Sequence, residues 1–422
     1  MPRLASLTAR QLAGQAGGGV TLVHTLNNPL PTNPDPIRYP NNFDYFGHAV
    51  AIDGNNAIVT AKEEFGDPDP TTGTQQNDEG KAYIFDVTTG ALVHTLDNPN
   101  AYGSGANDYF GQSAAIDGNY AIVGAWSEDA ANASNSGKAY IFNVSTGAVL
   151  HTIDNPTPSF GDNFGNSVGI SGNYAIVGSF NEDTVFSGQV RTSSGRAYIF
   201  DVTTGALLHT LDNPNDFGTP SSDRFGASVA ISGDRVIVGA WGEDAPGGFT
   251  DSGKAYIFDV TTGALVHTLD NPNPVIGSSP ADHFGFKVAI SGNRAIVSAP
   301  QEDEPNPGNT GKAYIFDVTT GSRLHTLDNP TPESSDRFGG GSVDISGNFA
   351  IVGAPNTGLG VGEAYIFDVT TGALVHTVRN PGPSGTTDYN TFGGAVAITD
   401  NRILVGAYQT DSFLGRAYIF KY

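Results

Sequence analysis

A single unit of sequence recurs seven times along this chain, and no other feature constrains its fold as strongly. The pair Phe-Gly heads the copies at intervals of 54 to 64 residues, beginning at Phe46, Phe110, Phe164, Phe225, Phe284, Phe338 and Phe392. The run Ala-Tyr-Ile-Phe and the pair His-Thr each occur seven times as well. Self-similarity of this kind indicates a repeat architecture, in which each unit buries its apolar surface against its neighbours.

The copy from Phe110 to Pro156 shows the plan of one unit. Four strand-like runs, FGQSAAI, YAIVGAW, KAYIF and AVLHTI, are separated by DGN, by a variable loop and by NVSTG. β-Branched and aromatic runs between Gly, Asn, Asp and Pro clusters are strand signals, and four short strands per unit predict the blade of a β-propeller. A β-solenoid is the competing repeat fold, but its repeats are usually shorter. We therefore predict an all-β fold, a seven-bladed propeller of four-stranded antiparallel blades, with a helical pattern only near the N-terminus.

One unit is split between the two ends of the chain. VTLVHTLNNP, at residues 20–29, matches the fourth strand of a unit but follows no Ala-Tyr-Ile-Phe run, and the chain ends on AYIFKY with no fourth strand after it. An open ring would leave raw sheet edges at its first and last blades. We expect the N-terminal strand to complete the last blade. The domain organisation is then an N-terminal docking peptide and Gly-rich linker, residues 1–19, before a propeller of residues 20–422.

The repeat resembles the FG-GAP repeat of bacterial propeller proteins, which is related to the head of the integrin α subunit. FGQSAAIDGNYAIVGAWSEDA and GKAYIF carry the resemblance, and SAP at Ser298 and GAP at Gly353 come nearest to the name motif. The resemblance implies the fold and says little about function. Integrin-type repeats often hold calcium in an Asp-rich loop between their first two strands. That connection is only DGN, SGN, SGD or TDN here, too short to supply six to eight oxygen ligands, so we predict no metal site.

Composition excludes several kinds of partner. With 20 Lys and Arg against 43 Asp and Glu, the chain carries a net charge of −23. That charge disfavours nucleic acid and anionic membrane surfaces, and no apolar run is long enough to span a bilayer. There is no Cys. If Met1 is the true start, the N-terminus also lacks a secretory signal. We predict no cofactor, because the Trp-docking pattern of quinoprotein propellers is absent.

Strand parity places the variable loops on one face. Connections between the first two and the last two strands of a unit are monotonous, whereas those between the second and third strands vary in length and chemistry. Variation of this kind marks binding surfaces in repeat proteins. The residue that follows the second strand stands out there, because it includes both tryptophans of the protein. In chain order it is Lys62, Trp126, Phe180, Trp241, Pro300, Pro355 and Tyr408. We predict that Trp126, Trp241, Phe180 and Tyr408 bind a ligand or partner, with aromatic cover over the blade packing as the alternative.

Repeated charged positions favour architecture over catalysis. Each of five loops carries a glutamate, and the third strand that follows opens with a base, which predicts an ion pair within the blade rather than a cation site or an acid–base pair. The five pairs are Glu64 with Lys81, Glu128 with Lys138, Glu182 with Arg196, Glu243 with Lys254 and Glu302 with Lys312. Seven of the nine His occupy one repeated strand position, while His48 and His283 lie beside two Phe-Gly pairs without a triad or metal-ligand context. We therefore predict no catalytic residue.

The segment before the ring needs a separate explanation. LASLTARQL can form about two helical turns, with Leu4, Leu7 and Leu12 roughly on one side, and faintly resembles N-terminal segments of marine bacteriophage virion proteins. The alternative is a tail without fixed structure. Three functions follow. The first is a non-enzymatic virion structural or host-attachment protein, assembled in the host cytoplasm and anchored by this peptide to other virion or surface proteins. The second is an extracellular or cell-surface adhesin that binds a glycan or protein receptor, and the third, ranked last, is a polysaccharide-acting enzyme.

Overall fold

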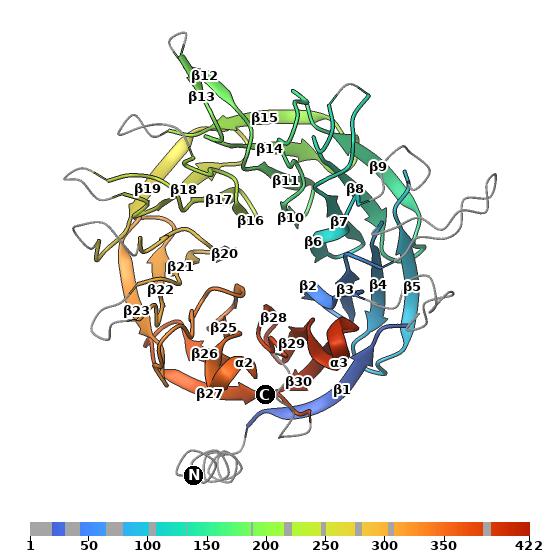
Figure 1. Ribbon diagram of the computed structural model, residues 1–422, viewed down its shortest axis with the longest axis vertical. Coiled ribbons are helices and arrows are strands. Elements are labelled where there is room, and N and C mark those ends of the chain that lie inside the picture. Colours follow the sequence, from blue (N-terminus) through green and yellow to red (C-terminus); the bar gives the residue numbers. More distant parts are fainter. Residues whose placement is uncertain are drawn as a thin grey trace.

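The protein folds into a ring of seven four-stranded antiparallel sheets, arranged like the blades of a propeller around a central axis (Figure 1). The computed structural model describes residues 19–29, 43–64, 79–100, 107–131, 133–186, 189–214, 222–245, 250–274, 281–302, 308–382 and 390–422. The predicted fold class and blade count are confirmed. Leu4, Leu7 and Leu12, the predicted anchor, lie outside the described residues, so that hypothesis stays a prediction.

Strand position within a blade follows sequence order from the axis outward. The innermost strands are β2 (Phe46–Asp53), β6 (Phe110–Asp117), β10 (Ser167–Ser171), β16 (Ser228–Ser232), β20 (Val288–Ser291), β24 (Val343–Ser346) and β28 (Ala395–Ile398). The second strands are β3 (Asn56–Ala61), β7 (Tyr120–Ala125), β11 (Tyr174–Ser179), β17 (Arg235–Ala240), β21 (Arg294–Ala299), β25 (Phe349–Ala354) and β29 (Arg402–Ala407).

The outer two strands of each blade carry the Ala-Tyr-Ile-Phe run and the His-Thr pair. The third strands are β4 (Lys81–Asp86), β8 (Lys138–Asn143), β14 (Arg196–Asp201), β18 (Lys254–Asp259), β22 (Lys312–Asp317), β26 (Glu363–Asp368) and β30 (Arg416–Lys421). The outermost strands are β5 (Leu92–Asp97), β9 (Val149–Asp154), β15 (Leu207–Asp212), β19 (Leu265–Asp270), β23 (Arg323–Asp328), β27 (Leu374–Arg379) and β1 (Thr21–Asn27).

Three short elements lie in the variable loops and were not predicted. Blade three carries a hairpin of β12 (Thr184–Phe186) and β13 (Gln189–Arg191). A single helical turn, α2 (Thr357–Gly360), and a short turn with left-handed backbone at Asp411 and Ser412, α3 (Thr410–Phe413), replace the longer loops of blades six and seven. The expectation of helical structure only near the N-terminus is therefore wrong for α2. This turn is too short to show a helical period in sequence.

The N-terminal strand completes the last blade, as predicted. β1 pairs antiparallel with β30, from Thr21 opposite Lys421 to Asn27 opposite Arg416. Figure 1 shows this blue strand against the red strands of the C-terminal end. Backbone hydrogen bonds between the two ends of the described chain thus close the ring.

The hydrophobic core lies between blades rather than within one. Each cluster of buried side chains combines residues of two neighbouring blades, such as Ile141 of blade two with Val177 of blade three. The Phe of each of the seven Phe-Gly pairs that head the repeats is fully buried and packs on the aromatic residues of the third strand. The Phe110 ring centroid lies 5.9 Å from that of Tyr140 and 5.9 Å from that of Phe142. Such aromatic contacts contribute beyond the area they bury.

Candidate functional site

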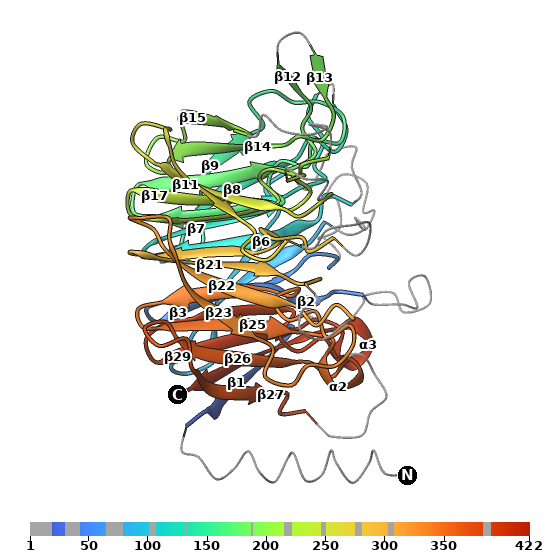
Figure 2. The same cartoon turned by 90° about the vertical axis from the view of Figure 1, so that its left-hand side faces the viewer.

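The variable loops all emerge on one side of the disc, which we call the variable face. Figure 2 shows the β12–β13 hairpin, α2 and α3 on this side, with the C-terminus on the opposite side. The short turns between the first and second strands lie with the C-terminus. The assignment of loops to faces by strand parity is confirmed.

Each Phe-Gly pair forms a tight turn at the variable face. The carbonyl oxygen of the residue before Phe accepts a hydrogen bond, 2.7 to 3.2 Å long, from the backbone N–H of the residue after Gly. Gly has positive φ in this turn, for example 90° at Gly47, as the third position of a type II turn requires. The turn therefore presents two variable side chains. The preceding residues are Tyr45, Tyr109, Asn163, Arg224, His283, Arg337 and Thr391, and the following ones are His48, Gln112, Asn166, Ala227, Phe286, Gly340 and Gly394.

The residue before Phe has a left-handed backbone in every blade. Its φ lies between 50° and 61° in all seven copies, although none of them is glycine. This conformation is sterically costly for Tyr, Arg or Thr, by about 1 kcal/mol or more per residue. A strained position that carries large side chains in most copies points to a role for those side chains at the surface.

Aromatic side chains from neighbouring blades meet on the variable face. The indole of Trp126 stacks on the ring of Phe180, with centroids 6.3 Å apart and an angle of 18° between the planes. Tyr109 approaches Trp126 from the other side at 6.4 Å. The ammonium of Lys62 then lies 5.7 Å from the ring centroid of Tyr109, within cation–π range.

Arg224 continues this row into blade four. Its guanidinium carbon lies 5.4 Å from the ring centroid of Phe180 and 5.9 Å from that of Trp241, so that it bridges the two aromatic side chains. Trp241 in turn contacts His283 of blade five at 4.7 Å. Arg224 also donates to the side-chain oxygen of Asn181.

Tyr408 closes the other end of the row. Its ring lies 6.0 Å from Tyr45 and 5.5 Å from His48, and Lys62 lies 5.7 Å from Tyr45. We call the resulting curved row the aromatic–cation arc; its members are Tyr408, Tyr45, Lys62, Tyr109, Trp126, Phe180, Arg224, Trp241 and His283.

The structure thus brings all four predicted aromatic residues to one face and one arc. Whether they bind a ligand stays a prediction. Sequence reasoning missed the alternate members of the arc, namely Tyr45, Tyr109, Arg224 and His283. The available signal was their variation at a fixed place between an Asp and the Phe-Gly pair.

A central channel of about 560 Å³ lies inside the ring and is lined by the innermost strands. His48, Lys287 and Arg337 contribute positive or titratable groups to its wall, and Asp344 contributes a carboxylate. Asp344 accepts backbone N–H groups of Ile345 and Ile398 at 2.8 Å each, so its charge is partly satisfied by the wall itself. The channel of this acidic protein therefore has a basic entrance on the variable face.

Electrostatics at this entrance favour an anion. Burial lowers the pKa of Lys287, which lies 5.6 Å from the ring centroid of Phe286. Burial, and then the charges of Lys62 and Lys287, hold the pKa of His48 well below its usual range. Burial also raises the pKa of Asp344 to about 6. A negative group placed here would stabilise the charged form of Lys287, which burial disfavours.

Comparison with known proteins agrees with the repeat structure. The model of the FG-GAP repeat matches six stretches, 40–85, 101–142, 158–200, 218–258, 277–316 and 331–367, which together cover more than half of the chain. The chain belongs to the FG-GAP repeat family. These stretches fall in blades one to six, and the seventh blade joins both ends of the chain. A search of curated proteins found no match. The family assignment supports a generic interaction module.

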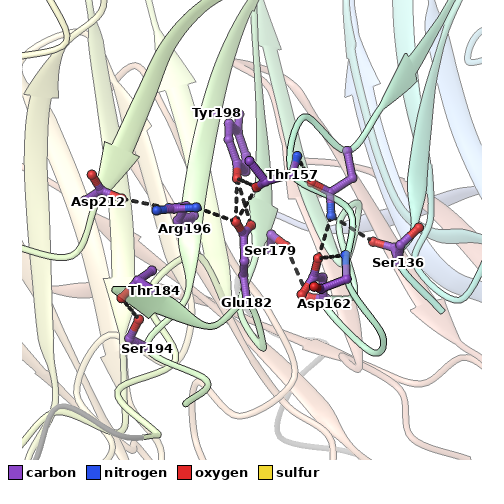
Figure 3. A network of polar contacts seen from close by, with 12 residues as sticks. Ser136, Thr157, Asp162, Ser179, Glu182, Thr184, Ser194, Arg196, Tyr198 and Asp212 are labelled. Atoms are coloured by element: carbon purple, nitrogen blue, oxygen red, sulfur yellow. Dashed lines mark hydrogen bonds and ion pairs between the residues drawn. The ribbon is translucent and has the colours of Figure 1, made fainter. Parts of the chain in front are cut away.

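The loop glutamates of this FG-GAP propeller point inward and bind the Tyr of the third strand. In blade three the Tyr198 hydroxyl donates to Glu182 at 2.8 Å, and Arg196 bridges Glu182 and Asp212 at 2.7 Å each (Figure 3). Thr157 adds a hydroxyl at 2.6 Å. The predicted ion pair is present, but its glutamate is buried rather than exposed. The missed partner was the Tyr hydroxyl, which must find an acceptor when buried.

The same carboxylate–phenol contact recurs in other blades with adjustments. Tyr83, Tyr140, Tyr256 and Tyr314 donate to Glu64, Glu128, Glu243 and Glu302 at 2.5 to 2.8 Å. The base contacts the glutamate directly in blades two, three and five, whereas Lys81 and Lys254 pair with outer-strand aspartates. The prediction of an ion pair with the loop glutamate is therefore wrong as a direct contact in blade four.

Blade six also places a carboxylate beside the Tyr hydroxyl, but there the acid lies on the third strand and the base on the outer strand. Glu363 stands where the other blades carry a base, opposite Arg379 in the outer strand, and their side chains lie 2.9 Å apart. Glu363 also accepts the hydroxyl of Tyr365 at 2.6 Å. A carboxylate beside the phenol is thus kept although the loop of this blade has no glutamate at that position.

Two other repeated polar residues join neighbouring blades. In six blades the Asp two residues before Phe accepts the side-chain amide of the Asn that ends the preceding outer strand, at 2.8 to 3.1 Å. In two of these blades the same Asp also caps its own turn. Asp162 accepts the backbone N–H of Ser159, and Asp336 accepts that of Glu333. Six of the repeated histidines place Nε2 2.9 to 3.1 Å from a carbonyl oxygen of the next blade. These groups are architectural.

We expect the stability of the propeller to fall as pH rises from 5 to 9. Burial raises the pKa of Glu64 and of Glu243 to about 8, and that of Asp44 and Asp108 to about 7. A carboxyl whose pKa is higher in the folded than in the unfolded state contributes its full stabilisation at pH values below its unfolded pKa, near 4.5. This contribution to the free energy of unfolding is lost as pH rises through the folded pKa. The thermal midpoint should fall by roughly 5 °C across the window.

Glu64→Gln should flatten this pH profile, because the amide cannot ionise. Glu182→Gln is the matched control, because Glu182 lies in the same position of blade three but forms an ion pair with Arg196. The control should lower the midpoint without flattening the profile. A wild-type profile that rises toward pH 9 would contradict the assignment of buried protonated carboxyls.

Two further properties complete the site. Among the described residues, no group of three or more His, Cys, Asp or Glu is arranged to hold a metal ion. No helix within the described ranges is long and apolar enough to cross a membrane.

Proposed function

We propose that the protein is a non-enzymatic attachment module of a bacteriophage virion, assembled in the host cytoplasm, which presents the variable face of its propeller to a receptor. The observation that carries the proposal is the division of labour between residues. Repeated titratable groups bind one another inside the blades, whereas varied aromatic and basic side chains gather on one face around the channel. A surface of this composition suits recognition, because aromatic and Arg side chains dominate interface energetics.

The placement on a virion rests on the N-terminal segment and its resemblance to phage virion proteins. Residues 1–19 precede the ring-closing strand, and residues 1–18 lie outside the described part of the chain. A short peptide of this kind can order on a partner protein. We propose that it joins the propeller to other virion proteins.

Two variants separate anchoring from receptor binding. Removal of residues 2–18 should abolish co-sedimentation of the protein with particles while leaving its thermal midpoint unchanged. Trp241→Ala should leave co-sedimentation intact and lower adsorption of particles to host cells by about ten-fold or more, because truncation of a Trp anchor typically costs over 1 kcal/mol. Unchanged co-sedimentation of the shortened protein would refute the anchor, and wild-type adsorption of Trp241→Ala would refute the receptor face.

A cell-surface or secreted adhesin is the second candidate, and the aromatic–cation arc favours it equally. The two functions differ in where the protein is found. An adhesin would be recovered from the envelope or medium of growing bacteria, without a particle.

A further inference from the structure

The arc and the channel entrance form one surface in which apolar rings alternate with positive charge. Trp126, Phe180 and Trp241 contribute half-buried apolar rings, and Arg224 lies between Phe180 and Trp241. Phe286 joins this surface to the channel, because its ring lies 6.2 Å from Trp241 and 5.6 Å from the ammonium of Lys287. A ligand that follows the arc therefore meets apolar faces and cations in turn.

Three cations of this surface differ from most bases of the blades, whereas Lys62 of the arc pairs with Glu63 at 3.7 Å. Most bases of the blades lie within 4 Å of a carboxylate, such as Lys138 with Glu128 and Arg235 with Asp259. Arg224, Lys287 and Arg337 make no ion pair with the described part of the chain. Three cations without a counter-ion, at one end of a channel in a protein of charge −23, leave an anion site open.

Several buried polar atoms of this surface also have no hydrogen-bond partner within the described residues. They are Nε1 of Trp126, Oδ1 of Asn166, Nε of Arg224 and Nδ1 of His283. Buried polar groups are normally satisfied, so a cluster of unsatisfied ones needs a ligand or water. The cluster contains donors and acceptors together, which suits a ligand rich in hydroxyl groups.

We propose that the channel entrance and the aromatic–cation arc bind an anionic polysaccharide, whose pyranose rings contact the half-buried side chains of Trp126 and Trp241 and whose carboxylate or sulfate groups pair with Arg224 and Lys287. Sugar rings supply apolar C–H faces for the aromatic side chains, hydroxyls for the unsatisfied polar atoms, and the acidic substituent supplies the missing counter-ion. The net charge of −23 opposes every polyanion, so binding depends on the local cations Arg224 and Lys287. This inference rests on the proposed role of the variable face in attachment and names the class of receptor.

Oligogalacturonides test the charge requirement on the full chain. The acidic octamer should bind at least about ten-fold more tightly than its methyl ester, which has the same rings without the charge, and the ratio should shrink as salt is raised from 50 to 500 mM. A sulfated galacto-oligosaccharide of equal length distinguishes the two sources of negative charge. Equal affinity for acid and ester, or no binding of any of the three, would overturn the proposal.

Lys287→Met tests the site, and Lys421→Met is its control. Lys421 is an exposed Lys at the end of β30, far along the strand from the variable face. Lys287→Met should remove the preference for the acid by about ten-fold while leaving ester binding and the thermal midpoint unchanged, and Lys421→Met should change neither. Equal effects of the two substitutions would overturn the site.

Competition distinguishes a saccharide from a polyanion in general. A glutamate octapeptide should compete at least ten-fold less well than the acidic octamer, because it lacks rings for the aromatic faces. Equal competition would overturn recognition of a saccharide. Particles that still adsorb to cells while the protein binds none of these oligosaccharides would overturn this inference and leave the attachment function standing.

Discussion

A protein that lacks residues 2–29 should fail to form a stable closed ring, whereas one that lacks only residues 2–18 should unfold at the wild-type temperature. The difference lies in β1, which is the fourth strand of blade seven. Without it β30 loses every partner from Thr21 to Asn27 and becomes an exposed edge. We expect a thermal midpoint lower by roughly 15 °C or more, together with self-association through that edge.

The effect should exceed that of removing an ordinary outer strand, because β1 joins two blades. Its backbone belongs to blade seven, but its side chains reach blade one. Asn28 donates to Asp44 at 2.9 Å and to Glu64 at 3.3 Å. His24 lies 2.9 Å from the carbonyl oxygen of Thr88.

Leu26 offers a milder test of the same junction. It is 2% exposed and packs in the cluster between blades seven and one. Leu26→Ala should cost about 2–5 kcal/mol of unfolding free energy. The 2–18 deletion, the 2–29 deletion and Leu26→Ala are each compared with the wild-type protein by calorimetry and by sedimentation velocity. Equal midpoints for the 2–18 and 2–29 deletions would show that the ring is held shut by other contacts.

The ring and its closure were predictable because several independent motifs of the repeat give the same count. Seven Phe-Gly pairs and seven Ala-Tyr-Ile-Phe runs set the blade count, and the one displaced His-Thr strand at His24 could only belong to the other end of the ring. Strand parity then assigned the loops to faces without any knowledge of distances.

The contacts between repeats were less predictable, since a repeat pattern does not show which residues of neighbouring blades lie close together. The Asn–Asp bonds that join blades link residues 7 to 16 positions apart across loops of different length. The arc positions before Phe were missed because Tyr45, Tyr109 and Arg224 adopt positive φ, a conformation that such side chains give no reason to expect. The Tyr hydroxyls were missed because alternation along the third strand marks Tyr140 as core and says nothing of the glutamate above it.

Two glycines of blade two, both with positive φ, should respond very differently to alanine. Gly118 lies in the turn between β6 and β7 with φ of 55°, and an added Cβ would meet nothing within 4 Å. Gly118→Ala should therefore cost only the strain of the left-handed backbone, about 1 kcal/mol. Gly137 precedes the third strand with φ of 83°, and its Cβ would lie 1.9 Å from the carbonyl oxygen of Phe164 in blade three.

Gly137→Ala cannot be relieved by a side-chain rotation, because the obstructing atom belongs to the backbone of the next blade. The two blades would have to separate where Gly137 forms a parallel bridge with Phe164. We expect a cost of more than about 3 kcal/mol, the sum of backbone strain and lost inter-blade packing, and a correspondingly lower thermal midpoint. Similar midpoints for the two variants would contradict this account. The expected difference means that the Gly before the basic residue of one repeat and the Phe-Gly pair of the next repeat together form the backbone contact between the two blades. The most recognisable residues of the repeat therefore dock the blades together.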